Sequence, residues 1–240
     1  GNADYTQNPQ ITYREALRPY MHGDAWIETG IDFILGPRAD RLMPPCGSSF
    51  LPDGLMQQLQ SATLDGRAVA GPPEELLPPQ RSWFRSVVYT PLLAHPVGWC
   101  VLILMWSLVW TIRRLLGHRA GHVTPRWERR AGKAVQLLAG VLGVLLLLMW
   151  AFTDHQDTWG NWNMLWASPF LPVLWALRKG QLYHWFRWIL SVVVVGFLLL
   201  FNFVPQFVPL SLLLLGWGVW LSLDPWKVPW ALSNAAKQEP

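Results

Sequence analysis

The sequence predicts an integral membrane protein, all-α in its membrane part, with about five transmembrane helices after a partial, irregular α+β segment. Three observations support this class. Of the 240 residues, 52% are hydrophobic and only 14% are charged, whereas a soluble domain carries ~25% charged residues. The charge deficit lies almost entirely after Thr90. The chain also contains 17 Trp, which suits a protein with many positions at membrane interfaces.

Five apolar stretches follow residue 90, and each approaches the ~20 residues that a helix needs to cross ~30 Å of hydrocarbon. They are residues 92–112, 134–152, 159–177, 185–204 and 207–223. The third and fifth are marginal in length. Pro169 and Pro172 would kink the third helix, and neighbouring helices would then cover the freed carbonyls. Gly140 and Gly143 in the second stretch are typical of close helix contacts.

Loop charges predict the orientation. The loop after the first stretch carries seven basic residues against one acid, Glu128, so it is cytoplasmic by the positive-inside rule. Residues 154–163 contain two acids and no Lys or Arg, so they face the other side. Five crossings then place residues 1–90 outside and the C-terminus in the cytoplasm. The net charge of +4 therefore reflects loop placement, and no nucleic-acid partner is expected.

These features divide the chain into four parts. They are residues 1–71, the end of an exported domain; 72–90, a Pro-rich linker; 91–223, the transmembrane domain; and 224–240, a cytoplasmic tail. Within the first part, Thr12 is the expected N-cap of a short helix that Pro19 ends early or kinks. A second short helix is expected at residues 50–59, and a turn with a short strand at residues 64–70.

The polar stretch between the second and third spans supplies the candidate site. Its candidates for binding substrate or lipid are Asp154, His155, Asn161, Trp162 and Asn163. Asp154 and His155 would orient a lipid headgroup or assist proton transfer at the membrane surface, or they would only anchor the loop. The two Asn would hold an ester or phosphate, or close the turn through their own backbone. We expect Trp159, Trp162 and Trp166 to be interface anchors.

Cysteine and histidine positions give no sign of a metal or cofactor. Cys46 lies in a polar region and Cys100 in an apolar span, so a disulfide between them is not expected. Neither a CxxC motif nor Cys/His metal spacing occurs. The sequence therefore predicts no metal site and no cofactor.

Two stretches together resemble the Lnb-type lipoprotein N-acyltransferase family. The first resembles the end of that family's periplasmic domain through an Arg-containing helix, a Trp, a GIDxxLG segment, an Asp-Arg pair and a Phe-Leu-Pro-Asp helix start. Its motif residues are Arg14, Trp26, Gly30, Asp32, Asp40, Arg41 and Asp53. The second, residues 153–169, resembles the polar loop of the family's transmembrane region. Independently of the family, Asp32, Asp40 and Arg41 are expected to form structural hydrogen bonds or an ion pair.

The resemblance implies a bacterial inner-membrane enzyme, with residues 1–90 in the periplasm, that acylates the N-terminal Cys amine of a lipoprotein. A Cys thiolate in a papain-like domain would take the acyl group from a lipid as a thioester and pass it to the amine. Cys46 falls outside the family's nucleophile motif. We therefore expect the nucleophile upstream of Gly1 and no catalytic residue within this chain.

A second hypothesis comes from a different class. The chain would be a non-catalytic membrane subunit or adaptor that packs against a larger complex through its Trp-rich spans. Expected partners are membrane lipids under either hypothesis, lipoprotein N-termini under the first and other membrane subunits under the second. A transporter is disfavoured, because the spans show neither an internal repeat nor the buried charges of a substrate path.

Overall fold

The computed structural model describes residues 11–21, 24–44, 47–72, 94–119, 125–177 and 180–224, together with residue 226. The elements before the membrane helices are α1 (Tyr13–Leu17), η1 (Arg18–Met21), α2 (Ala25–Ile34), η2 (Pro37–Asp40), η3 (Gly47–Phe50), α3 (Pro52–Ser61), β1 (Thr63–Leu64) and β2 (Arg67–Ala68). The later ones are α4 (Pro96–Arg119), α5 (Arg126–Phe152), η5 (Gln156–Thr158), η6 (Trp162–Leu165), α6 (Val173–Ala176), α7 (Gln181–Leu200), η7 (Phe201–Phe203) and α8 (Leu210–Ser222). The η elements are 3₁₀ helices.

The amino-terminal helices begin where capping side chains satisfy their first N–H groups. Thr12 and Glu15 form a reciprocal capping box at α1, which confirms the predicted N-cap. The α-helix ends at Leu17, and η1 carries Pro19. Asp24 caps α2 by accepting hydrogen bonds from the backbone N–H groups of the second and third helix residues. From here on, the cap means the whole segment of residues 11–44, which contains α1, η1, α2 and η2, and not a helix cap.

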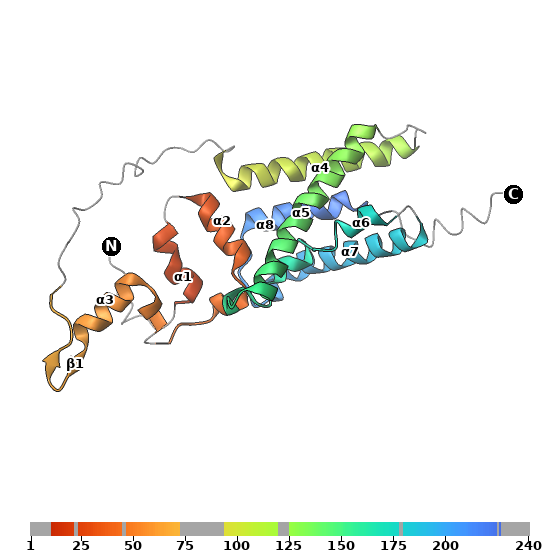
Figure 1. Ribbon diagram of the computed structural model, residues 1–240. Coiled ribbons are helices and arrows are strands. Elements are labelled where there is room, and N and C mark those ends of the chain that lie inside the picture. The colour runs from red at the N-terminus through yellow and green to blue at the C-terminus, as the bar shows by residue number, and fades with distance from the viewer. Residues whose placement is uncertain are drawn as a thin grey trace.

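A small hairpin follows α3 and matches the predicted turn and short strand. Thr63 pairs with Ala68 and Leu64 with Arg67 in an antiparallel ladder of two strands. Asp65 and Gly66 have φ angles of 50° and 76°, as a type I′ turn requires. The predicted helix over residues 50–59 corresponds to α3 at Pro52–Ser61. In Figure 1, α3 and the hairpin lie farther from the helical bundle than α1 and α2 do.

Within the part of the chain that the structure describes, three helices are long and apolar enough to cross a membrane, by length and composition. They are Pro96–Leu116 within α4, Arg126–Phe152, and Gln181–Phe203, which joins α7 to η7. The shorter apolar helix α8 packs against α4, α5 and α7 and is the central helix of the bundle. Phe33 of α2 packs on Trp166, with ring centroids 5.8 Å apart, so the cap shares the core of the helical bundle.

The expected third helix is not a continuous helix. Between Trp159 and Leu177 the chain forms η6, an irregular run and the single-turn α6. Pro169 and Pro172 lack N–H donors and disfavour helix in the residues before them, so the segment breaks rather than kinks. Trp166, Ala167 and Leu171 are fully buried, which fits the rule that irregular backbone at membrane depth is covered by protein. The prediction of five continuous helices is therefore not confirmed.

The bundle has two unlike ends. The cap contacts the loop after α5 and the loop before α8, as detailed below. At the opposite end lie the end of α4, the start of α5 and the end of α8, where Arg114 forms an ion pair with Asp224. The cap and the loop at residues 154–163 therefore share one end, and the basic residues at the end of α4 and the start of α5 lie at the other (Figure 1).

Candidate functional site

The polar loop after α5 lies directly against the cap. Gly36 donates its backbone N–H to the carbonyl of Asp157 at 2.7 Å, and Arg38 donates to Gln156 Oε1 at 2.8 Å. A Cβ at Gly36 would lie 2.5 Å from the carbonyl oxygen of Trp159. Only glycine at this position lets the two backbones approach so closely. The close approach fixes where the cap meets the loop.

Three buried amide side chains satisfy the carbonyls at the C-terminal end of α2. Asn161 Nδ2 donates to Phe33 O at 2.7 Å and to Ile34 O at 2.9 Å. Asn163 Nδ2 donates to Phe33 O at 3.1 Å, and Gln206 Nε2 donates to Leu35 O at 3.2 Å. The last carbonyls of a helix lack partners within the helix. The amides supply those partners from the helical bundle, and we call Asn161, Asn163 and Gln206 the amide clamp.

The amide clamp is also bonded internally. Gln206 Nε2 donates to Asn161 Oδ1 at 3.0 Å, and Gln206 Oε1 accepts the backbone N–H of Trp162 at 2.8 Å. Asn161 Oδ1 accepts the N–H of Asn163, and Asn163 Oδ1 accepts the indole N–H of Trp166. Both Asn side chains are buried, and each uses its oxygen and its NH2 group in these hydrogen bonds. The bonds close the turn and fasten the cap.

Arg14 is the second connection between cap and bundle. It is 1% exposed. Its guanidinium lies 2.9 Å from Asp32 Oδ1 and 2.7 Å from Asp40 Oδ1, and it also donates to Leu35 O at 3.1 Å. Asp40 Oδ2 accepts the backbone N–H of Phe207 at 2.9 Å, just before α8. The expected ion pair is present, but the cation is Arg14, and Arg41 instead lies exposed in the η2 turn.

Asp154 and His155 are the exposed titratable members of the predicted set. Both lie in the turn between α5 and η5. Their backbone carbonyls accept N–H groups of Gln156 and Thr158, and the His155 side chain makes no cap hydrogen bond. The side chains are thus accessible beside the buried clamp, on the same end of the bundle as the cap.

The helical part of the chain matches a family model. Residues 89–223 match the Lnb transmembrane domain. The chain belongs to the Lnb family. Searches of curated proteins and of solved structures each returned no significant match. The match covers α4 to α8 and therefore includes all three amides of the clamp, Asp154 and His155. The Lnb resemblance read from the sequence is confirmed.

Two of the remaining motif residues, Trp26 and Asp53, make hydrogen bonds that hold neighbouring elements together. Trp26 Nε1 donates to Ala94 O at 2.7 Å, which ties α2 to the residues just before α4. Asp53 accepts the Tyr20 hydroxyl at 2.9 Å. Gly30 lies on α2 with open space where a Cβ would be, and nothing in the structure explains a glycine there. Cys46 lies outside the described residues.

The Trp residues of the Lnb loop differ in environment. Trp159 and Trp162 are 50% and 37% exposed, as interface anchors would be. Trp166 is fully buried and bonded to Asn163, so the expectation that it faces a headgroup region is wrong for this residue.

Sequence reasoning missed the contribution of Gln206. Its only signal was a polar residue between Pro205 and Pro209 in an otherwise apolar stretch. Within the described ranges no group of three or more His, Cys, Asp and Glu side chains is placed to hold a metal ion.

Proposed function

We propose that this chain is the membrane-embedded part of a bacterial lipoprotein N-acyltransferase of the Lnb type. The match of residues 89–223 to the Lnb transmembrane domain carries the proposal. The geometry supports it, because the cap is fastened to one end of the bundle through buried side chains. A domain continuous with the cap would then be held at a fixed height over that membrane surface.

The proposed chemistry has two balanced steps. A Cys thiolate in a segment outside residues 1–240 attacks a phospholipid ester; a thioester forms, and the lysolipid leaves as the alcohol after protonation. The α-amine of the lipoprotein's N-terminal Cys then attacks the thioester carbonyl; an amide forms, the amine proton is lost and the thiolate is released. In this proposal residues 1–240 hold the catalytic domain in position over the membrane. Asp154 and His155 face the lipid headgroup or move a proton near it.

The topology in this proposal has five crossings of the bacterial inner membrane. The segment at residues 159–177 makes the third crossing as a broken helix, shielded by α5 and α7. The cap lies in the periplasm and the C-terminus in the cytoplasm. The basic residues clustered at the end opposite the cap support this orientation through the positive-inside rule.

Complementation tests the function. The complete natural gene would be expressed in bacteria depleted of their own lipoprotein N-acyltransferase, and the mass of a lipoprotein's N-terminal peptide would be measured. We expect the mass of one additional acyl chain, lost when the upstream Cys is changed to Ala. Full acylation by the Cys-to-Ala gene would refute the enzymatic proposal. It would favour the non-catalytic subunit, which should then co-purify in fixed ratio with other membrane proteins.

Labelling tests the topology. With Cys46, Cys100 and the proposed nucleophilic Cys replaced by Ser, a single thiol introduced as His155→Cys should react with a membrane-impermeant maleimide added outside spheroplasts. A thiol introduced as Arg130→Cys should react only after lysis. The reverse pattern would overturn the proposed orientation.

A further inference from the structure

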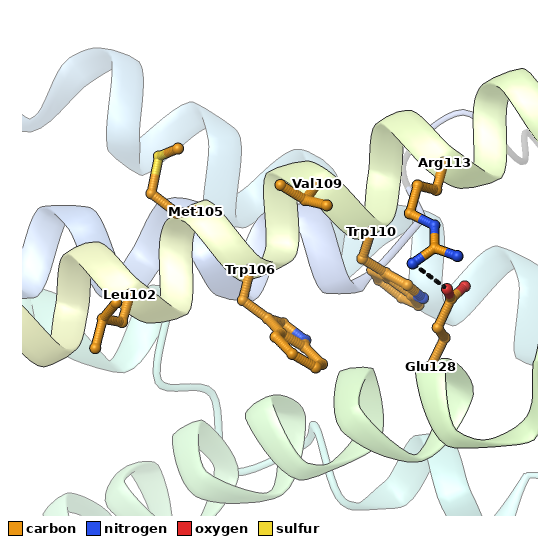
Figure 2. A pocket seen from close by; sticks show the side chains of 7 residues that line it. All are labelled: Leu102, Met105, Trp106, Val109, Trp110, Arg113 and Glu128. Carbon is orange, nitrogen blue, oxygen red and sulfur yellow. Dashed lines mark ion pairs between the residues drawn. The ribbon is translucent and has the colours of Figure 1, made fainter.

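A groove lies between α4 and α5, away from the cap. Its α4 residues recur at helical spacing and so form one continuous face. It is lined by Leu102, Met105, Trp106, Val109 and Trp110 together with Arg113 and Glu128, and its volume is about 270 Å³. In Figure 2, Leu102, Trp106 and Trp110 extend from α4 towards α5, and Arg113 reaches Glu128 of α5.

The groove is long enough to hold the part of an acyl chain that extends through one leaflet of the membrane. From Leu102 to Arg113 the helix rises roughly 16 Å at ~1.5 Å per residue, about half of the ~30 Å hydrocarbon core. Trp106 packs edge-on against Trp127 of α5, with centroids 5.6 Å apart. At the Arg113 end, a Cβ at Gly132 would lie 2.8 Å from the Trp110 ring, so the helices close together there. The groove is therefore apolar along its length and ends at a charged group.

Two side chains at the Arg113 end of the groove, Trp110 and Arg113, carry N–H donors that are not all used. Trp110 is 5% exposed, and its indole N–H is buried without a hydrogen-bond partner in the described part of the chain. Buried donors are normally bonded. Arg113 lies 3.5 Å from Glu128, yet its side chain is 60% exposed while that of Glu128 is 3% exposed. The guanidinium carries five N–H donors, so most of them face outward.

The charge at this end favours an anion. Glu128 and Asp224 are outnumbered there by basic residues of α4 and α5, which are Arg113, Arg114, Arg126, Arg129, Arg130 and Lys133. Basic pockets between membrane helices are suited to acidic headgroups, and guanidinium groups bind phosphate through paired hydrogen bonds. An apolar partner helix would leave the Arg113 and Trp110 donors unused. A zwitterionic phospholipid has the phosphate that these donors need, but its cationic headgroup would lie among the surplus basic residues, so a lipid of net negative charge is favoured.

We propose that this groove binds one anionic phospholipid, with an acyl chain along Leu102 to Val109 and its phosphate at Arg113 and the Trp110 indole N–H. This lipid lies in the leaflet at the end opposite the cap. It is therefore distinct from any acyl donor that reacts beneath the cap, and the inference does not depend on the proposed enzymatic function.

Native mass spectrometry of the purified full chain tests the proposal. The probes are phosphatidylglycerol and phosphatidylcholine with identical acyl chains. We expect phosphatidylglycerol to bind more tightly, and Arg113→Gln to weaken it about tenfold. Arg130→Gln removes the same charge from an exposed position outside the groove and should change the affinity less than about twofold. Equal losses in the two variants, or equal binding of the two lipids, would overturn the proposal.

Further measurements distinguish binding of a whole lipid from binding of its phosphate group alone. They also provide a test in case one variant fails to fold. Val109→Phe fills the groove and should weaken both lipids. Glycerol 3-phosphate should not compete; effective competition would assign the site to a soluble phosphate instead. If Arg113→Gln fails to fold, Glu128→Gln provides the second measurement. Removing the acid beside Arg113 should preserve or increase phosphatidylglycerol affinity, and a loss would contradict the proposal.

Discussion

The side-chain amide of Asn161 lies 2.7 Å from the carbonyl oxygen of Phe33, across 128 positions of sequence. This bond joins the loop after α5 to the end of α2, and Asn163 reaches the same carbonyl. A helix C-terminus that would otherwise present unpaired carbonyls is thereby fastened to the bundle. The polar loop that holds the candidate site residues thus also joins the cap to the membrane helices.

Asn161→Ala should loosen the cap. The substitution leaves the carbonyl of Ile34 without its amide partner, leaves that of Phe33 with Asn163 alone, and removes the side-chain acceptor for Gln206. We expect a cost of ~1–3 kcal/mol. Hydrogen exchange in detergent should show faster exchange in residues 11–44, with α5 and α7 unchanged. Asn202→Ala is the matched control, because Asn202 is an exposed amide in η7 at the same end of the bundle. Equal effects of the two variants would show that the clamp does not hold the cap.

Arg14→Gln should be more damaging than Asn161→Ala. It leaves the carboxylates of Asp32 and Asp40 without the cation between them, and breaking such a buried pair costs ~3–5 kcal/mol. Arg14→Lys should recover only part of this, because an ammonium cannot reproduce the planar fork of donors. The thermal midpoint in detergent measures the effect. Arg41→Gln is the control: Arg41 is exposed in the same motif, and a comparable fall in its midpoint would contradict the assignment.

Local signals in the sequence predicted most of the elements correctly. The capping box at Thr12, the turn at Asp65 and the long apolar helices depend on neighbouring residues, so a single sequence can indicate them. The partner of Asp40 could not be found in this way. Arg41 is adjacent in sequence, but the fold brings Arg14 to the carboxylate instead, across 26 positions.

The sequence left the role of the two Asn open between ligand binding and turn closure, for a related reason. Asn residues beside a Trp in a polar loop are typical both of ligand binding and of turn closure, and local sequence does not separate the two. The deciding fact is the position of the α2 carbonyls, which are 127 or more positions away. Likewise, two Pro residues indicated a kink at residues 159–177, whereas the structure shows a break there, and the local pattern does not separate the two outcomes.

Asp154→Asn and His155→Gln should separate function from stability. Both side chains are exposed, so each change should alter the free energy of unfolding by no more than ~0.5 kcal/mol. If these groups contact lipid or move a proton as proposed, acylation in the complementation assay should fall while the thermal midpoint stays unchanged. Full acylation by the double variant would show that the two side chains have no part in the reaction. A fall in the thermal midpoint would indicate a structural contact instead.

Gly143→Ala tests the packing of the broken segment against α5. A Cβ at Gly143 would overlap the carbonyl oxygen of Ala167 and lie 2.7 Å from Pro169 N. Backbone cannot yield as a flexible side chain can, so we expect a loss of ~1–3 kcal/mol. Gly196→Ala is the control within a membrane helix: nothing lies within 4 Å of its Cβ position, and alanine should gain up to ~1 kcal/mol from helix propensity. The two thermal midpoints should therefore move in opposite directions. If both rise together, the irregular segment does not pack on α5 at Gly143, and residues 159–177 cross the bundle in another way.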